Sequence, residues 1–268
     1  MKMFRSLVLL AAALAAAHAA HAVTYINDLF NSSPYTSGTL GGQDGWAGIS
    51  GNGTNNIQIT SGNVVLTTSG QDVQQPFIGG NISTSGLTSL YTTANFTITS
   101  AQTGDYFLHL GIFTNTSNFY QRLFVKAGSV GGTFDLGVLA VSGNTSPVSY
   151  GADLPLNAPL TVVVAWDFVA GATNDTFSLY VNPTDVRAND TAYSTATWGS
   201  PTAEPTTLGS VDFRQGSAAS AAGVQVSSVS VSDTFPVTGS VPEPSAFAAL
   251  FGASAIGLAA WRRSRRQA

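Results

Sequence analysis

The central part of the chain, residues 23–240, alternates short runs of β-branched and aromatic residues with turns rich in Gly, Asn, Ser, Thr and Pro. No stretch of it repeats apolar residues at the roughly 3.6-residue period of an amphipathic helix. Strands that follow one another at spacings of about ten residues are typical of antiparallel sandwiches and barrels, not of βαβ units. We therefore expect an all-β, antiparallel, jelly-roll-like sandwich. The strand candidates are 57–60, 63–67, 90–98, 106–114, 120–126, 133–141, 160–169, 175–181 and 224–231.

Two local signals add detail to this prediction. Ser61-Gly62 separates the first two strand candidates by two residues, which is the signature of a tight hairpin. The alternation of valines in the last candidate changes phase at Ser227-Ser228. A phase change inside a strand indicates a β-bulge.

The composition excludes several classes of protein. The chain has no Cys, which excludes a disulfide scaffold, a thiolate zinc site and a cysteine nucleophile. Residues 23–240 contain four basic and thirteen acidic residues, a formal charge of −9. Nucleic-acid binders need a basic surface to neutralise phosphates, so we expect no nucleic-acid partner.

The first 22 residues have the three parts of a secretory signal peptide. Lys2 and Arg5 form a positive start, residues 7–17 are apolar, and Ala20-His21-Ala22 is an A-x-A cleavage site. We expect removal of residues 1–22 and export of the rest of the chain.

The other end of the chain resembles a membrane-anchored tail. A Pro-rich linker, 236–245, precedes the apolar stretch 246–261 and the short tail 262–268. Sixteen residues of helix cover about 24 Å, close to the thickness of a bilayer core with Trp261 at the interface. We expect one transmembrane helix there, with the basic tail held in the cytoplasm by the positive-inside rule. The residues of this cytoplasmic stop are Arg262, Arg263, Arg265 and Arg266.

The order of Val-Pro-Glu-Pro-Ser, a short apolar span and a terminal Arg cluster resembles the PEP-CTERM sorting signal. In that resemblance Pro242, Glu243 and Pro244 are the recognition tripeptide. The family implies a partner, a membrane enzyme called exosortase, in Gram-negative bacteria that make exopolysaccharide. It also implies a precursor anchored in the inner membrane and a final place at the cell surface or in the extracellular matrix.

A second resemblance, to concanavalin A-like (LamG-type) sandwiches, rests on several weaker motifs. These are Asp28-Leu29-Phe30, Gly42-Gln43-Asp44-Gly45-Trp46, the run 160–168 and Ser178-Leu179-Tyr180-Val181-Asn182-Pro183. Trp46 and Trp166 could stack on glycans, but a sandwich of this size needs such volume inside, so core positions are favoured.

Catalytic sets are poorly represented in residues 23–240. His109 is the one histidine there, and it lies in an apolar strand candidate, so we interpret it as a core or strand-face residue and not as a general base. A glycoside hydrolase needs two carboxyl groups about 5–9 Å apart, yet the E-x-D-x-x-E strand of the laminarinase-type enzymes is absent. We expect a protein that is not an enzyme and keep hydrolysis as a distant third reading.

Two binding hypotheses remain for the sandwich. Asp175, Asp185 and Asp190 lie in loops rich in oxygen ligands, where LamG-like modules often hold Ca²⁺, although Asn and Asp also suit plain turns. Trp198 and Tyr193 are candidate glycan-stacking residues. We favour a non-catalytic structural or adhesive envelope protein among exopolysaccharides, with a calcium-assisted lectin-like module as the alternative.

Overall fold

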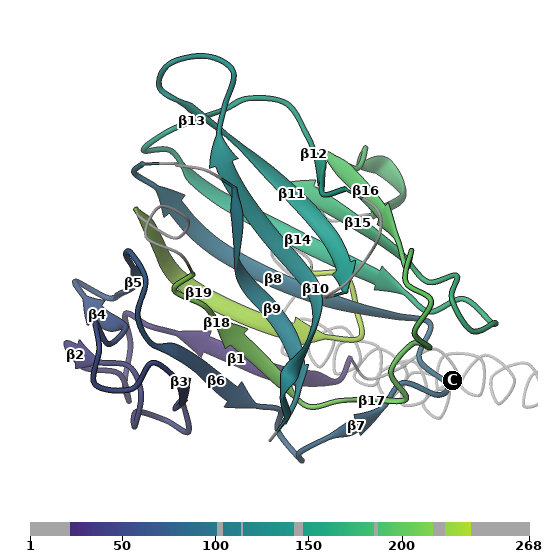
Figure 1. Cartoon of the computed structure of the whole chain (residues 1–268), viewed down its shortest axis with the longest axis horizontal. Coiled ribbons are helices and arrows are strands. Elements are labelled where there is room, and N and C mark those ends of the chain that lie inside the picture. Colours follow the sequence, from purple (N-terminus) through teal and green to yellow (C-terminus); the bar gives the residue numbers. More distant parts are fainter. Residues whose placement is uncertain are drawn as a thin grey trace, which may run out of the picture.

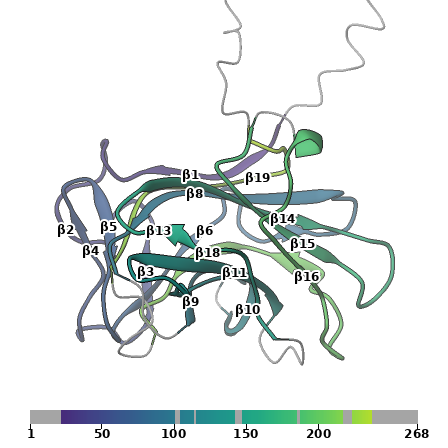
Figure 2. The same cartoon turned by 90° about the horizontal axis from the view of Figure 1, so that it is seen from above.

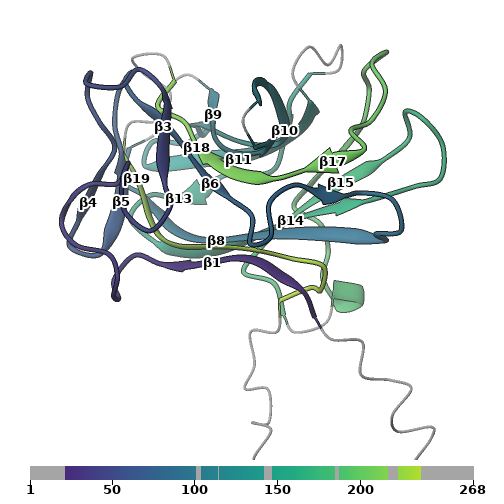
Figure 3. The same ribbon diagram turned by 90° about the horizontal axis from the view of Figure 1, so that it is seen from below.

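The computed structural model describes residues 22–100, 104–113, 115–141, 147–184, 187–216 and 223–236. Within them the chain forms two large antiparallel sheets that pack face to face (Figure 1). Figures 2 and 3 show the two layers from the side, one with β1, β8, β14 and β19 and the other with β9, β10, β11 and β18. The expected all-β antiparallel sandwich is confirmed.

One layer is a nine-stranded sheet with the order β16-β15-β14-β8-β19-β5-β4-β2, and β1 pairs with β19 beside this path. Every pairing in it is antiparallel. The strands are β1 Thr24–Leu29, β2 Gly38–Thr39, β4 Gln58–Thr60, β5 Asn63–Leu66, β8 Ser89–Ile98, β14 Pro159–Asp167, β15 Thr176–Val181, β16 Ser194–Thr197 and β19 Val224–Ser232.

The other layer is an eight-stranded sheet with the order β12-β11-β10-β9-β18-β6-β3, and β13 pairs with β11. A separate pair, β7 and β17, and the short 3-10 helix η1 complete the described secondary structure. Their bounds are β3 Ala47–Ser50, β6 Asp72–Pro76, β7 Ile82–Ser83, β9 Asp105–Ile112, β10 Asn115–Ala127, β11 Thr133–Val141, β12 Ser149–Tyr150, β13 Leu154–Pro155, β17 Thr207–Leu208, β18 Ser210–Phe213 and η1 Arg187–Asn189.

Each of the nine strand candidates from the sequence overlaps a strand of the structure. The hairpin is also confirmed: Ser61 and Gly62 both have positive φ, 50° and 75°, as a two-residue turn of type I′ requires. The register between β19 and β8 shifts between Val226 and Ser228, which is the expected bulge.

The core lies between the two sheets and is formed by apolar side chains from both inner faces. Trp46 and Trp166 are 1% and 0% exposed, so the prediction that they are core aromatics is confirmed. Trp166 is stacked between Phe168 and Trp198, and Trp46 is stacked on Phe213. Burial of large aromatic side chains removes much apolar area from water and is a main source of stability in a fold of this kind.

The two ends of the described sandwich meet at one place. The backbone nitrogen of Val23 donates to the Asp233 carboxylate at 2.8 Å, where β1 pairs with β19. Two residues further on, Phe235 packs edge-on against Tyr91 and Tyr180, on the outer face of the nine-stranded sheet. The segment that leads to the C-terminal tail therefore starts from this face.

The expected signal peptide 1–22, apart from Ala22, and the linker, span and tail from residue 237 onward lie outside the described residues. Within the ranges given above, no helix has the length and apolar character needed to cross a bilayer.

Candidate functional site

The outer face of the eight-stranded sheet carries a cluster of aromatic and basic side chains, which we call the aromatic–cationic face. Tyr106, Phe124 and Leu139 form its buried base, 6–8% exposed, and half-buried side chains pack around that base. The face consists of Tyr106, His109, Phe119, Arg122, Phe124, Lys126, Leu139, Val148, Tyr150, Asp212 and Arg214.

Strand alternation places these side chains on the outside of the sheet. In β10, Leu123 and Val125 belong to the core between the sheets, whereas Arg122, Phe124 and Lys126 point to the opposite face. Phe124 lies opposite Tyr106 of β9, so the two rings meet across the strands, 5.4 Å apart.

The cations of the face lie over its aromatic rings. The guanidinium groups of Arg122 and Arg214 are 5.0 and 4.3 Å from the Tyr106 ring centre, and Lys126 Nζ is 4.4 Å from the centre of the Tyr150 ring. These are cation–π distances. The segment 23–240 has four basic residues, and three of them lie over ring faces on this one side of the sandwich. The segment as a whole is acidic.

Two of these cations have carboxylate partners. Arg214 Nη1 lies 2.6 Å from Asp105 Oδ2, and Lys126 Nζ lies 3.3 Å from Asp135 Oδ2. Arg122 differs from both, because its Nη2 donates to the Val141 carbonyl at 2.6 Å and it has no ion pair with a described residue. Its Nε is buried and has no hydrogen-bond partner among the described residues.

A buried His–Asp pair lies next to these cations. β18 pairs with β9 so that Asp212 is opposite His109, and Oδ2 of Asp212 lies 3.1 Å from Nδ1 of His109. Nδ1 also lies 3.2 Å from the Leu110 carbonyl oxygen, so we assign the ring hydrogen to Nδ1, which can then donate to both oxygens. Burial lowers the pKa of His109 to about 3 and raises the pKa of Asp212 to about 8. Burial therefore opposes a charge on either side chain.

Gly111 leaves the space that this pair needs. A Cβ atom at position 111 would lie 2.6 Å from Oδ2 of Asp212 and 2.7 Å from Oγ of Ser210. The Ser210 hydroxyl donates to Asp212 at 3.3 Å, and the described contacts include no hydrogen bond from Ser210 to His109. The three side chains therefore do not have the order of a Ser–His–Asp relay, in which the imidazole must contact the hydroxyl.

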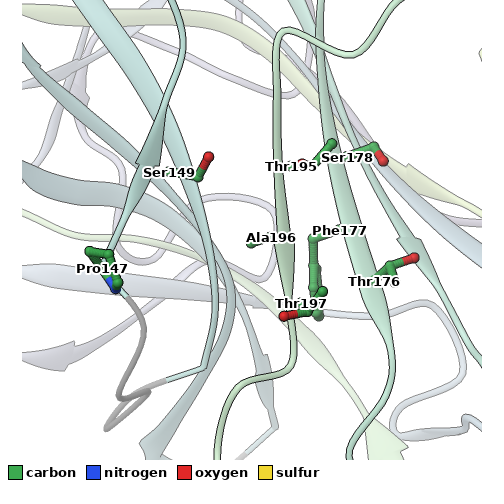
Figure 4. A pocket seen from close by; sticks show the side chains of 8 residues that line it. All are labelled: Pro147, Ser149, Thr176, Phe177, Ser178, Thr195, Ala196 and Thr197. Carbon is green, nitrogen blue, oxygen red and sulfur yellow. The ribbon is translucent and has the colours of Figure 1, made fainter.

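A pocket of about 450 Å³ opens at one side of the sandwich, between the edges of the two sheets. Figure 4 shows Pro147 and Ser149 on one side of it and the neighbouring strands β15 and β16 on the other. A hydrogen bond of 2.6 Å from Ser194 Oγ to the Ser149 carbonyl joins the two edges. The pocket can offer hydrogen bonds but no charge, because its lining is Pro147, Ser149, Thr176, Phe177, Ser178, Thr195, Ala196 and Thr197.

The prediction that Trp198 is a glycan-stacking residue is wrong. Its side chain is 0% exposed and stacks in the core against Tyr120, Trp166 and Phe177. Its indole N–H donates to the Thr202 carbonyl at 2.7 Å, so the polar edge is also occupied.

Tyr193, the second predicted stacking residue, is half-buried and lies beside Gly151. Its hydroxyl donates to the Ala152 carbonyl, and burial raises its pKa to about 12. One face of the ring is therefore used to hold the segment between β12 and β13. Whether the rest of the ring contacts a glycan stays a prediction.

The predicted calcium ligands do not come together. Asp175 precedes β15 and Asp190 follows it, and a six-residue strand is about 20 Å long. Both carboxylates are used internally: Asp175 accepts from Trp166 Nε1 and the Val169 nitrogen, and Asp190 accepts from Thr184. Asp185 lies outside the described residues, which contain no cluster of three or more His, Asp or Glu suited to a metal ion. Asp175 and Asp190 thus do not fit one Ca²⁺ site.

The aromatic–cationic face was not singled out from the sequence. Its signal was present in the alternation of Arg122, Phe124 and Lys126 along a single strand candidate, in a domain with only four basic residues. The pairing of His109 with Asp212 had no such signal, since it depends on which strands become neighbours.

By its fold, the described part of the chain is a two-layer β-sandwich with an aromatic–cationic outer face. At the C-terminus, residues 240–266 match the PEP-CTERM protein-sorting motif. The predicted motif residues Pro242, Glu243 and Pro244 and the four arginines from Arg262 to Arg266 fall inside this match, although they lie outside the described residues. The chain therefore carries a sorting motif that implies export, processing by an exosortase and a place at the cell surface.

Solved structures of similar overall course are sandwich domains. The CBM2 module of the evolved Dit of Lactobacillus casei BL23 phage J-1 has a TM-score of 0.49 at 11% identity, covering 79% of this chain and 95% of that one. The carbohydrate recognition domain of Emp46p in its metal-free form has 0.46 at 10%, covering 80% and 97%. The T. cruzi calreticulin globular domain has 0.44 at 10%, covering 80% and 89%. No curated protein matches the chain. At these identities and scores, the similarities carry no information about a ligand.

Proposed function

We propose that the protein is a non-catalytic, exported envelope protein that adheres to exopolysaccharide through the aromatic–cationic face. The observation that carries this proposal is the concentration of half-buried aromatic rings and three cations on one face of an acidic sandwich. Aromatic rings provide flat apolar surfaces on which sugar rings can stack, and polar groups beside them fix orientation.

The position of this face relative to the tail supports an adhesive role. The root of the sorting tail, at Phe235, packs on the outer face of the nine-stranded sheet. The aromatic–cationic face belongs to the opposite layer (Figure 3). A tail held at an envelope surface therefore leaves the aromatic–cationic face turned away from that surface, where a matrix polysaccharide can reach it.

The non-catalytic part of the proposal is supported by the state of the titratable groups. His109 and Asp212 are 1% and 3% exposed, and their mutual contact uses Nδ1 and Oδ2. A glycoside hydrolase needs an acid and a base or nucleophile on either side of an accessible bond. No pair of described carboxyl groups lines the pocket between the sheet edges.

Binding of the purified full chain to a panel of immobilised neutral and acidic polysaccharides tests this function. We expect saturable binding to at least one polysaccharide and no new reducing ends after prolonged incubation. Phe119→Ala should weaken binding about two- to tenfold, because it removes a half-buried ring of the face. Tyr150→Ala should do the same, because it removes a half-buried ring and the aromatic contact that positions Lys126. Leu29→Ala, which shortens an exposed side chain on the opposite layer, is the matched control and should bind normally.

Two results would contradict the proposal. One is the absence of binding to every polysaccharide of the panel by a chain shown to be folded. The other is binding that Phe119→Ala, Tyr150→Ala and Leu29→Ala all leave unchanged, which would place the contact elsewhere. Release of shortened oligosaccharides would contradict the non-catalytic part of the proposal and would indicate a glycoside hydrolase.

A further inference from the structure

The basic residues of the sandwich differ in one respect that bears on the ligand. Arg187, Arg214 and Lys126 each have a carboxylate partner, at distances up to 3.3 Å. Arg122 alone has no ion pair with a described residue, although it lies in the middle of the aromatic–cationic face. The domain has an excess of acidic residues, so a scarcity of carboxylates does not explain this.

The sequence also limits which undescribed residues could serve as a counterion. The internal segments 101–103, 142–146 and 217–222 and residue 114 contain no Asp or Glu. Asp185 is the one acid in an undescribed internal segment, and the described residues on either side of that segment, Thr184 and Arg187, belong to the connection that follows β15. Arg187 contacts Tyr91 and Tyr180 on the outer face of the other sheet.

Arg122 is held in a position from which it can receive an anion. Its guanidinium lies 5.0 and 5.3 Å from the ring centres of Tyr106 and Phe124, and its Nη2 is bound to the Val141 carbonyl. Its Nε has no hydrogen-bond partner among the described residues but is buried, so the nitrogen open to a ligand is Nη1, which has no partner there and is not buried. A carboxylate can accept a charge-assisted hydrogen bond from this nitrogen.

We infer that Arg122 binds a carboxylate group of the polysaccharide, so that the ligand is an acidic, uronate-type glycan. This inference rests on the proposed function and specifies its ligand. The sugar contacts the half-buried rings of the face, Phe119 and Tyr150, and its carboxylate reaches the guanidinium of Arg122.

The test uses two probes that share one backbone, polygalacturonate and its fully methyl-esterified form. Binding of the purified full chain is measured at about 0.15 M salt, where unspecific attraction between separated charges is largely screened. We expect the acid form to bind at least about tenfold more tightly than the ester, because esterification removes the charge-assisted hydrogen bonds.

Three variants assign this preference to one side chain. Arg122→Gln should bind the acid and the ester equally, while Arg122→Lys, which keeps a charge but loses the planar fork, should retain a reduced preference. Gln225→Glu changes the net charge by the same amount on the outer face of the nine-stranded sheet and should behave as wild type. Urea unfolding of each variant checks that it is folded.

The outcomes separate the two proposals. Equal binding of acid and ester by the wild type, or an acid preference that Arg122→Gln keeps, overturns the inference about Arg122 and leaves the adhesive function intact. Binding of polyglutamate as tight as that of polygalacturonate also overturns it, because the face would then select charge without sugar. Failure to bind any polysaccharide overturns the proposed function itself.

Discussion

The two outer faces of the sandwich each carry an arginine over two aromatic rings, yet the two arginines are in opposite electrostatic situations. Arg187 lies 5.7 Å from the ring centres of Tyr91 and Tyr180, and Arg122 lies 5.0 and 5.3 Å from those of Tyr106 and Phe124. Only Arg187 has a counterion: both of its terminal nitrogens bind the Asp167 carboxylate, one of them at 2.6 Å.

This contrast extends to the pKa values. The hydrogen bonds to Asp167 raise the pKa of Arg187, and those from Arg187 and Ser89 hold the pKa of Asp167 below its ordinary value although burial opposes this. Burial lowers the pKa of Arg122 instead. An arginine whose charge is paired with a carboxylate inside the fold contributes to stability. A half-buried arginine without an ion pair has a desolvation cost that no described carboxylate offsets. The comparison therefore distinguishes Arg187, a structural clasp that is paired with Asp167, from Arg122, the proposed receptor for a carboxylate of the ligand.

The largest change in the free energy of unfolding should come from removing the ion pair between Arg187 and Asp167. Arg187→Met keeps much of the apolar stem but leaves the partly buried Asp167 carboxylate with only the Ser89 hydroxyl. We expect a loss of about 2 kcal/mol in the free energy of unfolding, since hydrogen bonds to charged groups contribute about 1.5–3 kcal/mol and partial exposure reduces this. Urea denaturation measures it, and a loss below about 0.5 kcal/mol would show that Arg187 is no clasp.

The buried His109–Asp212 pair should make the stability of the fold depend on pH between about 6.5 and 8. In the folded chain Asp212 keeps its proton up to a pKa of about 8, whereas in the unfolded chain it loses the proton above the ordinary aspartate pKa of 3.8. His109 is neutral when folded, with a pKa of about 3, but charges below about pH 6.5 when unfolded. From about pH 4 to 6.5 the pair holds one proton in both states, on Asp212 in the folded chain and on His109 in the unfolded chain. Between about pH 6.5 and 8 only the folded state holds a proton, so stability should fall with rising pH, by up to about 2 kcal/mol.

Asp212→Asn tests this assignment, because the amide preserves the shape and can still accept from Nδ1. The variant should lose the decline between pH 6.5 and 8 and should instead lose stability as the pH falls below 6.5, where only its unfolded state binds a proton. Asp44→Asn, on an exposed loop, serves as the matched control and should follow the wild-type profile. A profile of Asp212→Asn parallel to that of the wild type would show that the carboxyl group of Asp212 is not the source of the decline.

The sequence predicted the sandwich well because strand composition and turn residues are local. The run Thr133–Val141 was expected as a strand with the bounds it has, and Ser61-Gly62 as a tight turn. Short strands such as β18, Ser210–Phe213, were missed, because alternation of apolar and polar residues over so few positions is weak evidence for a strand. In the fold that polar residue, Asp212, is a member of the aromatic–cationic face.

The candidate site was predicted poorly because it is made by long-range register. His109 was correctly interpreted as a strand residue, but its partner could not be deduced without knowing that β18 lies beside β9. Trp198 was predicted to stack on a glycan, yet the tertiary fold buries it completely. Residue type shows which side chains can bind a glycan, while packing decides which of them are available.

Removal of the receptor arginine should affect stability little. Arg122→Met takes away a charge that is partly desolvated and has no ion-pair partner among the described residues, and it keeps an apolar stem over Tyr106 and Phe124. We expect the free energy of unfolding to change by less than about 1 kcal/mol or to rise, since replacing a poorly compensated buried charge by a packed apolar side chain is often stabilising. A loss as large as that of Arg187→Met would abolish the distinction between the two arginines.

The smallest effect should follow the removal of calcium. The loop after β15 contains two of the predicted calcium ligands, Asp190 and, outside the described residues, Asp185. Asp190 already accepts hydrogen bonds from the nitrogen and the hydroxyl of Thr184, so its charge helps to order the turn without a metal. We expect the melting temperature with excess EGTA to stay within about 1 °C of that with millimolar Ca²⁺, because a ligand stabilises the fold only if it binds the folded state. A rise of several degrees on adding calcium, lost in Asp190→Asn, would show that both faces bind ions and that the receptor is not confined to the aromatic–cationic face.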